Sequence, residues 1–137
     1  SGIDIKDLDF SNETVNDTQK KIVAVATNSA KYGISARSGY CQAWVADVYQ
    51  AVTGSRGSAH CALCAADMWA VSSDWSKIPV GAAIYGYSSS QYGHVGIYIG
   101  NGMVAHNIGY IKIEPIEDWI KTYKGFAWGW ENNMSLV

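Results

Sequence analysis

Three side chains carry the chemistry that this sequence could perform: one cysteine and two histidines. Cys41 lies two residues after Gly39 in the stretch GYCQAWVADVY (residues 39–49), and His94 and His106 both lie in the stretch GHVGIYIGNGMVAH (residues 93–106). A thiol becomes an effective nucleophile when a base takes its proton, and histidine is the usual base. The combination therefore predicts a cysteine hydrolase, although packing in the core is the more common role of a cysteine considered alone.

The element that must position Cys41 is a helix with this residue in its first turn. One helical stripe of apolar residues comprises Cys41, Val45, Val48 and Val52. We expect the helix to begin near Ser38 or Gly39 and to end at Gly54, because glycine suits a helix C-terminus. The unpaired N–H groups of the first turn and the positive end of the helix dipole favour a thiolate, and they could also hold an oxyanion.

The two histidines must be positioned by neighbouring strands of a hairpin. Alternate residues of the first strand form an apolar set, Val95, Ile97 and Ile99, and a second set, His94, Gly96 and Tyr98. A three-residue loop at 100–102 would place His106 opposite Gly96, on the face of His94 and diagonal to it. A two-residue Asn-Gly turn would place Asn107 there instead and turn His106 away. Either side chain could orient the imidazole of His94.

The rest of the chain changes from a helical to an extended pattern. Residues 16–33 predict a helix that begins with a capping box of Asn16 and Gln19 and ends at Gly33, and residues 59–71 predict another helix. Short β-prone segments follow at 80–87, 93–100, 103–109, 110–115 and 126–131, with a short helix at 116–123. Helices followed by strands predict an α+β fold, with N-terminal helices packed on one side of a five- to six-stranded antiparallel sheet.

Length and composition fit one domain. We expect residues 16–137 to form that domain and residues 1–15 to be a leader that lies on the surface or is partly loose. A net charge of −2 without a basic block argues against nucleic acid and anionic membranes as partners. No apolar stretch is long enough to span a membrane. The chain begins with Ser and shows no signal peptide, so we expect an excised domain or a processed product.

The other cysteines form the motif His60-Cys61-x-x-Cys64. An odd total of three cysteines argues against a disulfide scaffold. A zinc site needs four ligands, and no second pair of ligands is near in the sequence. A redox pair is a further alternative, but no thioredoxin-like βαβ pattern precedes it. We therefore expect Cys61 and Cys64 to be buried packing residues, and we expect no metal or other cofactor.

Both stretches that carry the candidate residues resemble the NlpC-type cysteine peptidases, small papain-like enzymes that cut peptidoglycan stem peptides. The resemblance covers residues 18–130, and its most specific part is the motif His-hydrophobic-Gly-(hydrophobic)₃-Gly-Asn-Gly-x-x-x-His. It implies that Cys41 is the nucleophile, that His94 is the base and that His106 orients the base. It therefore favours the three-residue loop, and substitution of Asn107 by alanine is then expected to be nearly silent.

The resemblance also implies where substrate binds, and here the sequence departs from the family. The family motif Asp-Cys-Ser-Gly is replaced by Tyr40-Cys41-Gln42-Ala43, which removes the Asp and Ser that are linked to binding the free amine and backbone of the stem peptide. Gln42, next to the nucleophile, becomes a candidate for binding the substrate or the oxyanion. The tyrosine that the family uses at the oxyanion site corresponds to Tyr32, at a shorter spacing from the cysteine.

These features predict a cell-wall hydrolase, the monomeric catalytic domain of a larger protein that acts on peptidoglycan outside the cell or in the wall. One alternative is a CHAP-type N-acetylmuramoyl-L-alanine amidase, which pairs Cys and His with a downstream Glu or Asn. Glu131 and Asn132 are the candidates for that role, but their place in the last strand argues against it. The other alternative is a wall-binding module that has kept the fold and lost the activity.

Overall fold

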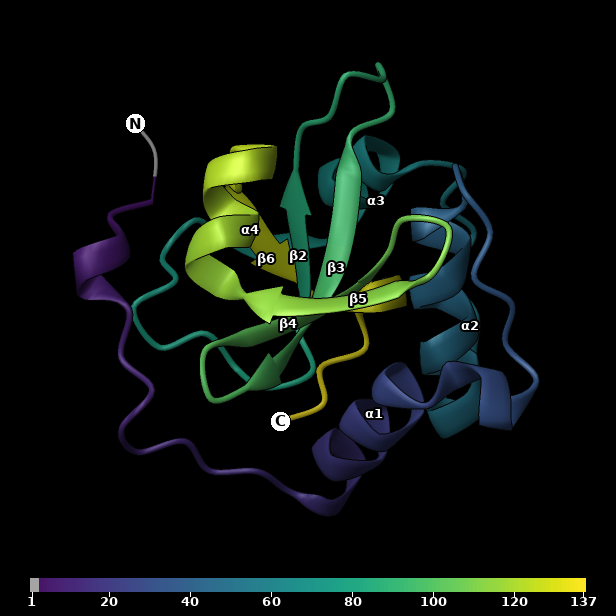
Figure 1. Ribbon diagram of the computed structural model, residues 1–137. Coiled ribbons are helices and arrows are strands. Elements are labelled where there is room, and N and C mark those ends of the chain that lie inside the picture. Colours follow the sequence, from purple (N-terminus) through teal and green to yellow (C-terminus); the bar gives the residue numbers. More distant parts are fainter. Residues whose placement is uncertain (1–2) are drawn as a thin grey trace.

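The computed structural model describes residues 3–137, which form an α+β fold as predicted (Figure 1). The α-helices of this part of the chain are α1 (Asp17–Thr27), α2 (Cys41–Thr53), α3 (Ala62–Trp69) and α4 (Ile116–Tyr123). Its strands are β1 (Ala70–Ser72), β2 (Ala83–Gly86), β3 (His94–Gly100), β4 (Met103–Asn107), β5 (Ile111–Pro115) and β6 (Ala127–Gly129). They form one antiparallel sheet of six strands in the order β1-β6-β2-β3-β4-β5. Short 3₁₀ helices occupy Ile5–Asp7, Ser29–Tyr32 and Glu131–Asn133.

The helix boundaries follow the local signals in most places. The capping box of Asn16 and Gln19 starts α1, and Gly54 ends α2 in the left-handed region with φ 78°. The helix predicted for residues 59–71 is shorter, because residues 70–72 leave it to form β1. β1 pairs with β6 at Gly129, where a Cβ atom would lie 2.1 Å from the carbonyl oxygen of Trp69. Only glycine permits this close approach of the two backbones.

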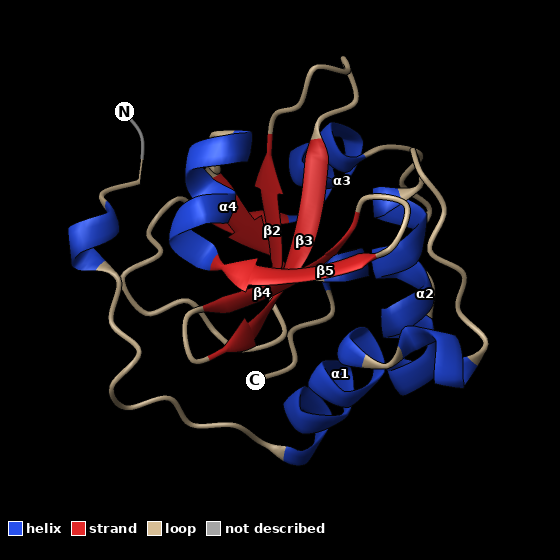
Figure 2. Cartoon of the chain, viewed as in Figure 1, coloured by secondary structure: helices blue, strands red, loops and turns tan. Residues whose placement is uncertain are grey.

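The short helix α4, which follows β5, does not lie with the N-terminal helices (Figure 1). Both alternating sets of side chains in β3 are buried, including Val95 and Ile97 in one set and Tyr98 in the other. Figures 1 and 2 show α4 and α2 at opposite sides of the central strands β2 and β3. His94 belongs to the set of β3 residues that faces the aromatic rings of α4. The histidines therefore lie inside a covered layer of the fold instead of on an open sheet face.

The N-terminal segment is more firmly attached than the sequence suggests. The Asp9 N–H donates to the carbonyl of Ser76 at 2.8 Å. The Glu13 carboxylate accepts the Tyr98 hydroxyl and also the Asn101 N–H, the latter at 2.8 Å. Residues 3–15 thus run across the turn between β3 and β4, while the first two residues of the predicted leader lie outside the described residues. Within residues 3–137, no helix combines the length and the apolar character that crossing a membrane requires.

Candidate active site

Cys41 is the first residue of α2, with Tyr40 as the N-cap. It is a free, half-buried thiol. Burial raises the pKa of this thiol, and the backbone N–H groups of Val95, Gln42 and Cys41 itself act in the opposite direction by stabilising the thiolate. Val95 directly follows His94, so this effect of the Val95 N–H on the thiol comes from the start of β3. Cys41 therefore has the predicted position in the first turn of its helix.

The strand register brings the two histidines together. Ile97 pairs with Ala105, so the preceding residue Gly96 faces His106, and a Cβ atom on Gly96 would lie 3.2 Å from that of His106. Nε2 of His94 lies 2.8 Å from Nδ1 of His106. Both rings are buried, with exposed fractions of 7% and 0%. The prediction that His106 stands beside His94 is therefore confirmed.

A third polar group, which the sequence analysis missed, extends this pair. In the pairing of β4 with β5, Glu114 faces Val104, two residues from His106 on the same side of the strand. Its Oε2 atom lies 2.5 Å from Nε2 of His106, and its Oε1 atom lies 3.7 Å from Nζ of Lys112. The alternation in the sequence YIKIEP already places Lys112 and Glu114 on one face, so this parity was the available signal.

The hydrogen bonds fix the tautomers of both rings. A carboxylate can only accept, so His106 donates from Nε2 to Glu114 and presents an unprotonated Nδ1. His94 must then donate from Nε2 to that atom, which leaves the lone pair of its own Nδ1 free to accept a proton. Burial, followed by the influence of His106, lowers the pKa of His94 to about 3. The imidazole is therefore neutral at physiological pH and is available as a base.

Aromatic rings of α4 restrain the histidines. The ring of Tyr123 stacks on His94 with a centroid distance of 4.1 Å and an interplanar angle of 25°. The ring of Trp119 meets His106 edge-on at 6.3 Å. Burial raises the pKa of the Tyr123 hydroxyl, and the charges of Glu114 and Cys41 raise it further. Packing of this kind limits rotation of the imidazoles and keeps the hydrogen bonds aligned.

The two candidates for substrate or oxyanion binding lie differently. The ring of Tyr32, in the 3₁₀ helix at Ser29–Tyr32, is 51% exposed, and its hydroxyl makes no hydrogen bond to any other described residue. Gln42 is buried, and its Nε2 donates to Oε1 of Glu131 at 2.7 Å. The Gln42 amide is therefore directed into the core and is engaged with Glu131, and its role in binding substrate stays a prediction. Its backbone N–H acts to lower the pKa of the Cys41 thiol.

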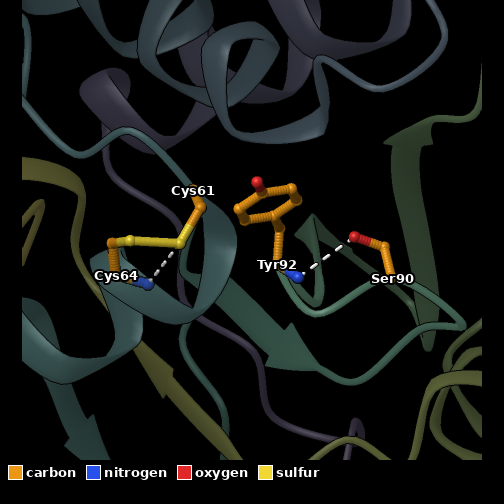
Figure 3. Close-up of a disulfide and its surroundings, with 4 residues drawn as sticks. All are labelled: Cys61, Cys64, Ser90 and Tyr92. Atoms are coloured by element: carbon orange, nitrogen blue, oxygen red, sulfur yellow. Dashed lines mark hydrogen bonds between the residues drawn. A yellow bond between two sulfur atoms is a disulfide. The ribbon is translucent and has the colours of Figure 1, made fainter.

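Cys61 and Cys64 form a disulfide at the start of α3, so the expectation that they are buried packing residues is wrong (Figure 3). Sγ of Cys61 accepts the N–H of Cys64 at 3.0 Å and so caps the helix. Within the same turn, the Leu63 N–H donates to the carbonyl of Tyr92 at 3.0 Å. The turn enclosed by the disulfide thus holds the loop that leads into His94. Among residues 3–137, no three His, Cys, Asp or Glu side chains group in a way that could hold a metal ion.

Comparison with known proteins adds no assignment: no family model matches the chain, and no curated protein matches it. The function of the site must therefore be argued from its geometry and from the motifs in the sequence.

Proposed function

We propose that this chain is a cysteine peptidase that hydrolyses an amide bond in peptidoglycan stem peptides. The hydrogen-bonded series His94–His106–Glu114 beside a free thiol in the first turn of a helix carries this proposal. The NlpC-type resemblance and the papain-like arrangement that it implies are part of the proposal. The sequence motif supports them, and so does the observed order of a helix with the cysteine followed by strands with the base.

In the proposed mechanism, Sγ of Cys41 attacks the carbonyl carbon of the scissile amide while Nδ1 of His94 takes the thiol proton. The oxyanion of the tetrahedral intermediate accepts the backbone N–H of Cys41. Nδ1 of His94 then gives its proton to the leaving amine, and a thioester remains on Cys41. Water attacks the thioester while Nδ1 of His94 takes its proton. The C–S bond then breaks, the carboxylic acid leaves, and His94 gives its proton to the Cys41 thiolate.

The relay from His94 to Glu114 stabilises the step in which charge develops. His94 becomes an imidazolium when it takes the thiol proton, although burial opposes that charge. His106 accepts the Nε2–H of this imidazolium, and the negative charge of Glu114 stabilises it through His106. The thiol and the imidazole are both neutral before substrate binds, because burial raises the pKa of Cys41 and lowers the pKa of His94. Proton transfer therefore accompanies attack.

Two further observations bear on the alternatives. Glu131, the acidic residue that a CHAP-type amidase could use, is fully buried and accepts the amide of Gln42, so it is not available to His94. The Cys61–Cys64 disulfide supports an extracellular or cell-wall location, because disulfides persist in oxidising compartments.

Digestion of purified peptidoglycan, followed by mass spectrometry of the products, tests the proposal. We expect fragments with new amino termini on stem-peptide residues. Cys41→Ser should abolish their release while its circular dichroism spectrum matches that of the unaltered protein. Release of the whole peptide from muramic acid would establish an amidase instead. If the peptidoglycan stays intact and the protein co-sediments with it, the chain is a binding module.

A further inference from the structure

The N-terminus of α2, where Cys41 lies, has no capping side chain from its own N-cap residue. Tyr40 is the N-cap of α2, yet its side chain makes no capping hydrogen bond. The turn is closed by the N–H of Tyr40, which donates to the carbonyl of Arg37 at 3.1 Å, and Gly39 adopts φ 84° within it. Helices are usually fixed at this end by a side chain of the N-cap residue. Another group must therefore hold the backbone that places Cys41.

Asn107, the last residue of β4, supplies that group. Its Nδ2 donates to the carbonyl of Arg37 at 2.8 Å and to the carbonyl of Tyr40 at 3.3 Å. Its Oδ1 accepts the N–H of Gly109 at 2.9 Å. The side chain is only 2% exposed, so these bonds form away from competing water. The buried Asn107 amide therefore holds the turn before Cys41 at two points, the carbonyls of Arg37 and Tyr40.

The position of Asn107 in β4 connects the two halves of the site. Successive side chains of a strand point to opposite faces. His106 points to the face where it meets His94, and Asn107 points to the face where it meets the turn that leads into α2. One strand therefore fixes both the base and the nucleophile.

We propose that Asn107 is a positioning residue that sets the orientation of the Cys41 thiol through the turn formed by residues 37–40. This inference rests on the proposed role of Cys41 as the nucleophile, and it differs from the expectation that substitution of Asn107 by alanine is nearly silent. Without the two donated hydrogen bonds, the turn and the first residue of α2 can shift, and the thiol can move relative to the backbone N–H groups that lower its pKa.

The decisive variant is Asn107→Asp. It keeps the shape of the side chain and the acceptor for Gly109, but it removes both donors and places an anion against two carbonyl oxygens. The matched control is Asn16→Asp, which likewise loses one donated bond to a carbonyl, that of Leu136, and keeps its acceptor at the start of α1. Asn107→Ala serves as a second variant without the added charge, in case the aspartate variant does not fold.

The readout is the pH dependence of alkylation of Cys41 by iodoacetamide under non-reducing conditions, where it is the free thiol. We expect both Asn107 variants to react about tenfold more slowly at neutral pH, because loss of one N–H contact shifts a thiol by about one pKa unit. Simple destabilisation would have the opposite effect, because opening of the fold exposes the thiol and accelerates labelling. Profiles that coincide with that of Asn16→Asp, or faster labelling, would overturn the inference.

Hydrolysis of stem peptides gives a second, separate readout. The maximal rate, kcat, should fall about 10²-fold in the Asn107 variants, with a smaller change in KM, because misplacing a reacting group mainly affects the chemical step. If the unaltered protein cuts no peptide and yet the alkylation profiles shift as expected, the proposed peptidase function fails while the positioning role of Asn107 stands.

Discussion

Replacing Glu114 by glutamine keeps the length of the side chain and removes its charge, so it isolates the contribution of the carboxylate to the His94–His106 relay. Two consequences follow, depending on how the new amide is oriented. If its oxygen faces Nε2 of His106, the tautomers stay as they are and only the charge is lost. If its NH₂ group faces His106, the ring must accept there and carry its proton on Nδ1. His94 must then hold its proton on Nδ1, the atom that should receive the thiol proton.

The magnitude of the first consequence follows from distances in the structure. The ring centroids of His94 and His106 are 5.1 Å apart, and a hydrogen bond of 2.5 Å joins His106 to Glu114. Allowing for the radius of the ring, the carboxylate lies about 8 Å from the imidazolium that forms on His94, which at an effective dielectric constant of about 20 gives ~2 kcal/mol of attraction. Loss of that attraction corresponds to about 30-fold in rate. Reversal of the tautomers approaches the effect of losing the base, about 10²–10⁴-fold.

The assay is kcat on a purified stem peptide, measured alongside the ¹⁵N chemical shifts of the two imidazoles, which report the protonated nitrogen of each ring. Glu117→Gln, an identical change at an exposed position in the first turn of α4, is the control and should retain full activity. We expect Glu114→Gln to lose at least 30-fold in kcat, and a loss beyond 10²-fold should coincide with reversed tautomers. A variant within twofold of the unaltered enzyme, with unchanged imidazole shifts, would refute the relay.

Three further perturbations test the surroundings of the site. Gln42→Ala should lower the free energy of unfolding by about 1.5–3 kcal/mol, because it leaves the buried Glu131 carboxylate without the Gln42 amide as donor. A change in KM, measured far below the melting temperature of the variant, would instead support a role of Gln42 in binding substrate. The buried His94 resists protonation that the unfolded chain accepts, so the urea midpoint should fall as the pH is lowered from 6.5 toward about 3; an equally steep fall in His94→Gln would contradict this assignment. Replacing Cys61 and Cys64 by alanine should lower the free energy of unfolding by about 2 kcal/mol, because the unfolded chain gains conformational entropy, and the variant should keep most peptidase activity. Loss of activity in a folded variant would show that the disulfide is needed to position the base, His94.

The parts of the fold that sequence patterns predict are those fixed by local physics. The capping box at Asn16 and the glycine at position 54 act within one turn of a helix, so their consequences are visible in a few residues. β1 was not predicted, because AVS continues an apolar pattern that also suits a helix, and it becomes a strand only through pairing with β6. The position of α4 on the second side of the central strands also depends on tertiary packing that no short segment encodes.

The candidate site likewise contains residues that sequence patterns predict and residues whose roles depend on tertiary packing. Cys41 and His94 could be identified because a helix start and a strand start each leave a signature in the sequence. The hydrogen-bond partners of Glu114, Gln42 and Asn107 could not be assigned, because each partner is brought near only by the sheet or by the 3₁₀ helix at Glu131–Asn133. A buried amide has no sequence signature that separates it from an exposed one, so its role appears only when its hydrogen bonds are known.

The hairpin between β3 and β4 shows how a correct register arises from a turn that was predicted incorrectly. Asn101 and Gly102 have φ values of 54° and 74° and form the two-residue turn that Asn-Gly favours, instead of the expected three-residue loop. With a regular ladder, this turn would have placed Asn107 opposite Gly96. An irregularity between Tyr98 and Gly100 shifts the pairing by one residue, as a β-bulge does, and returns His106 to that position. The extra residue in β3 thus lets the chain keep its favoured turn and still bring the two histidines into one hydrogen bond.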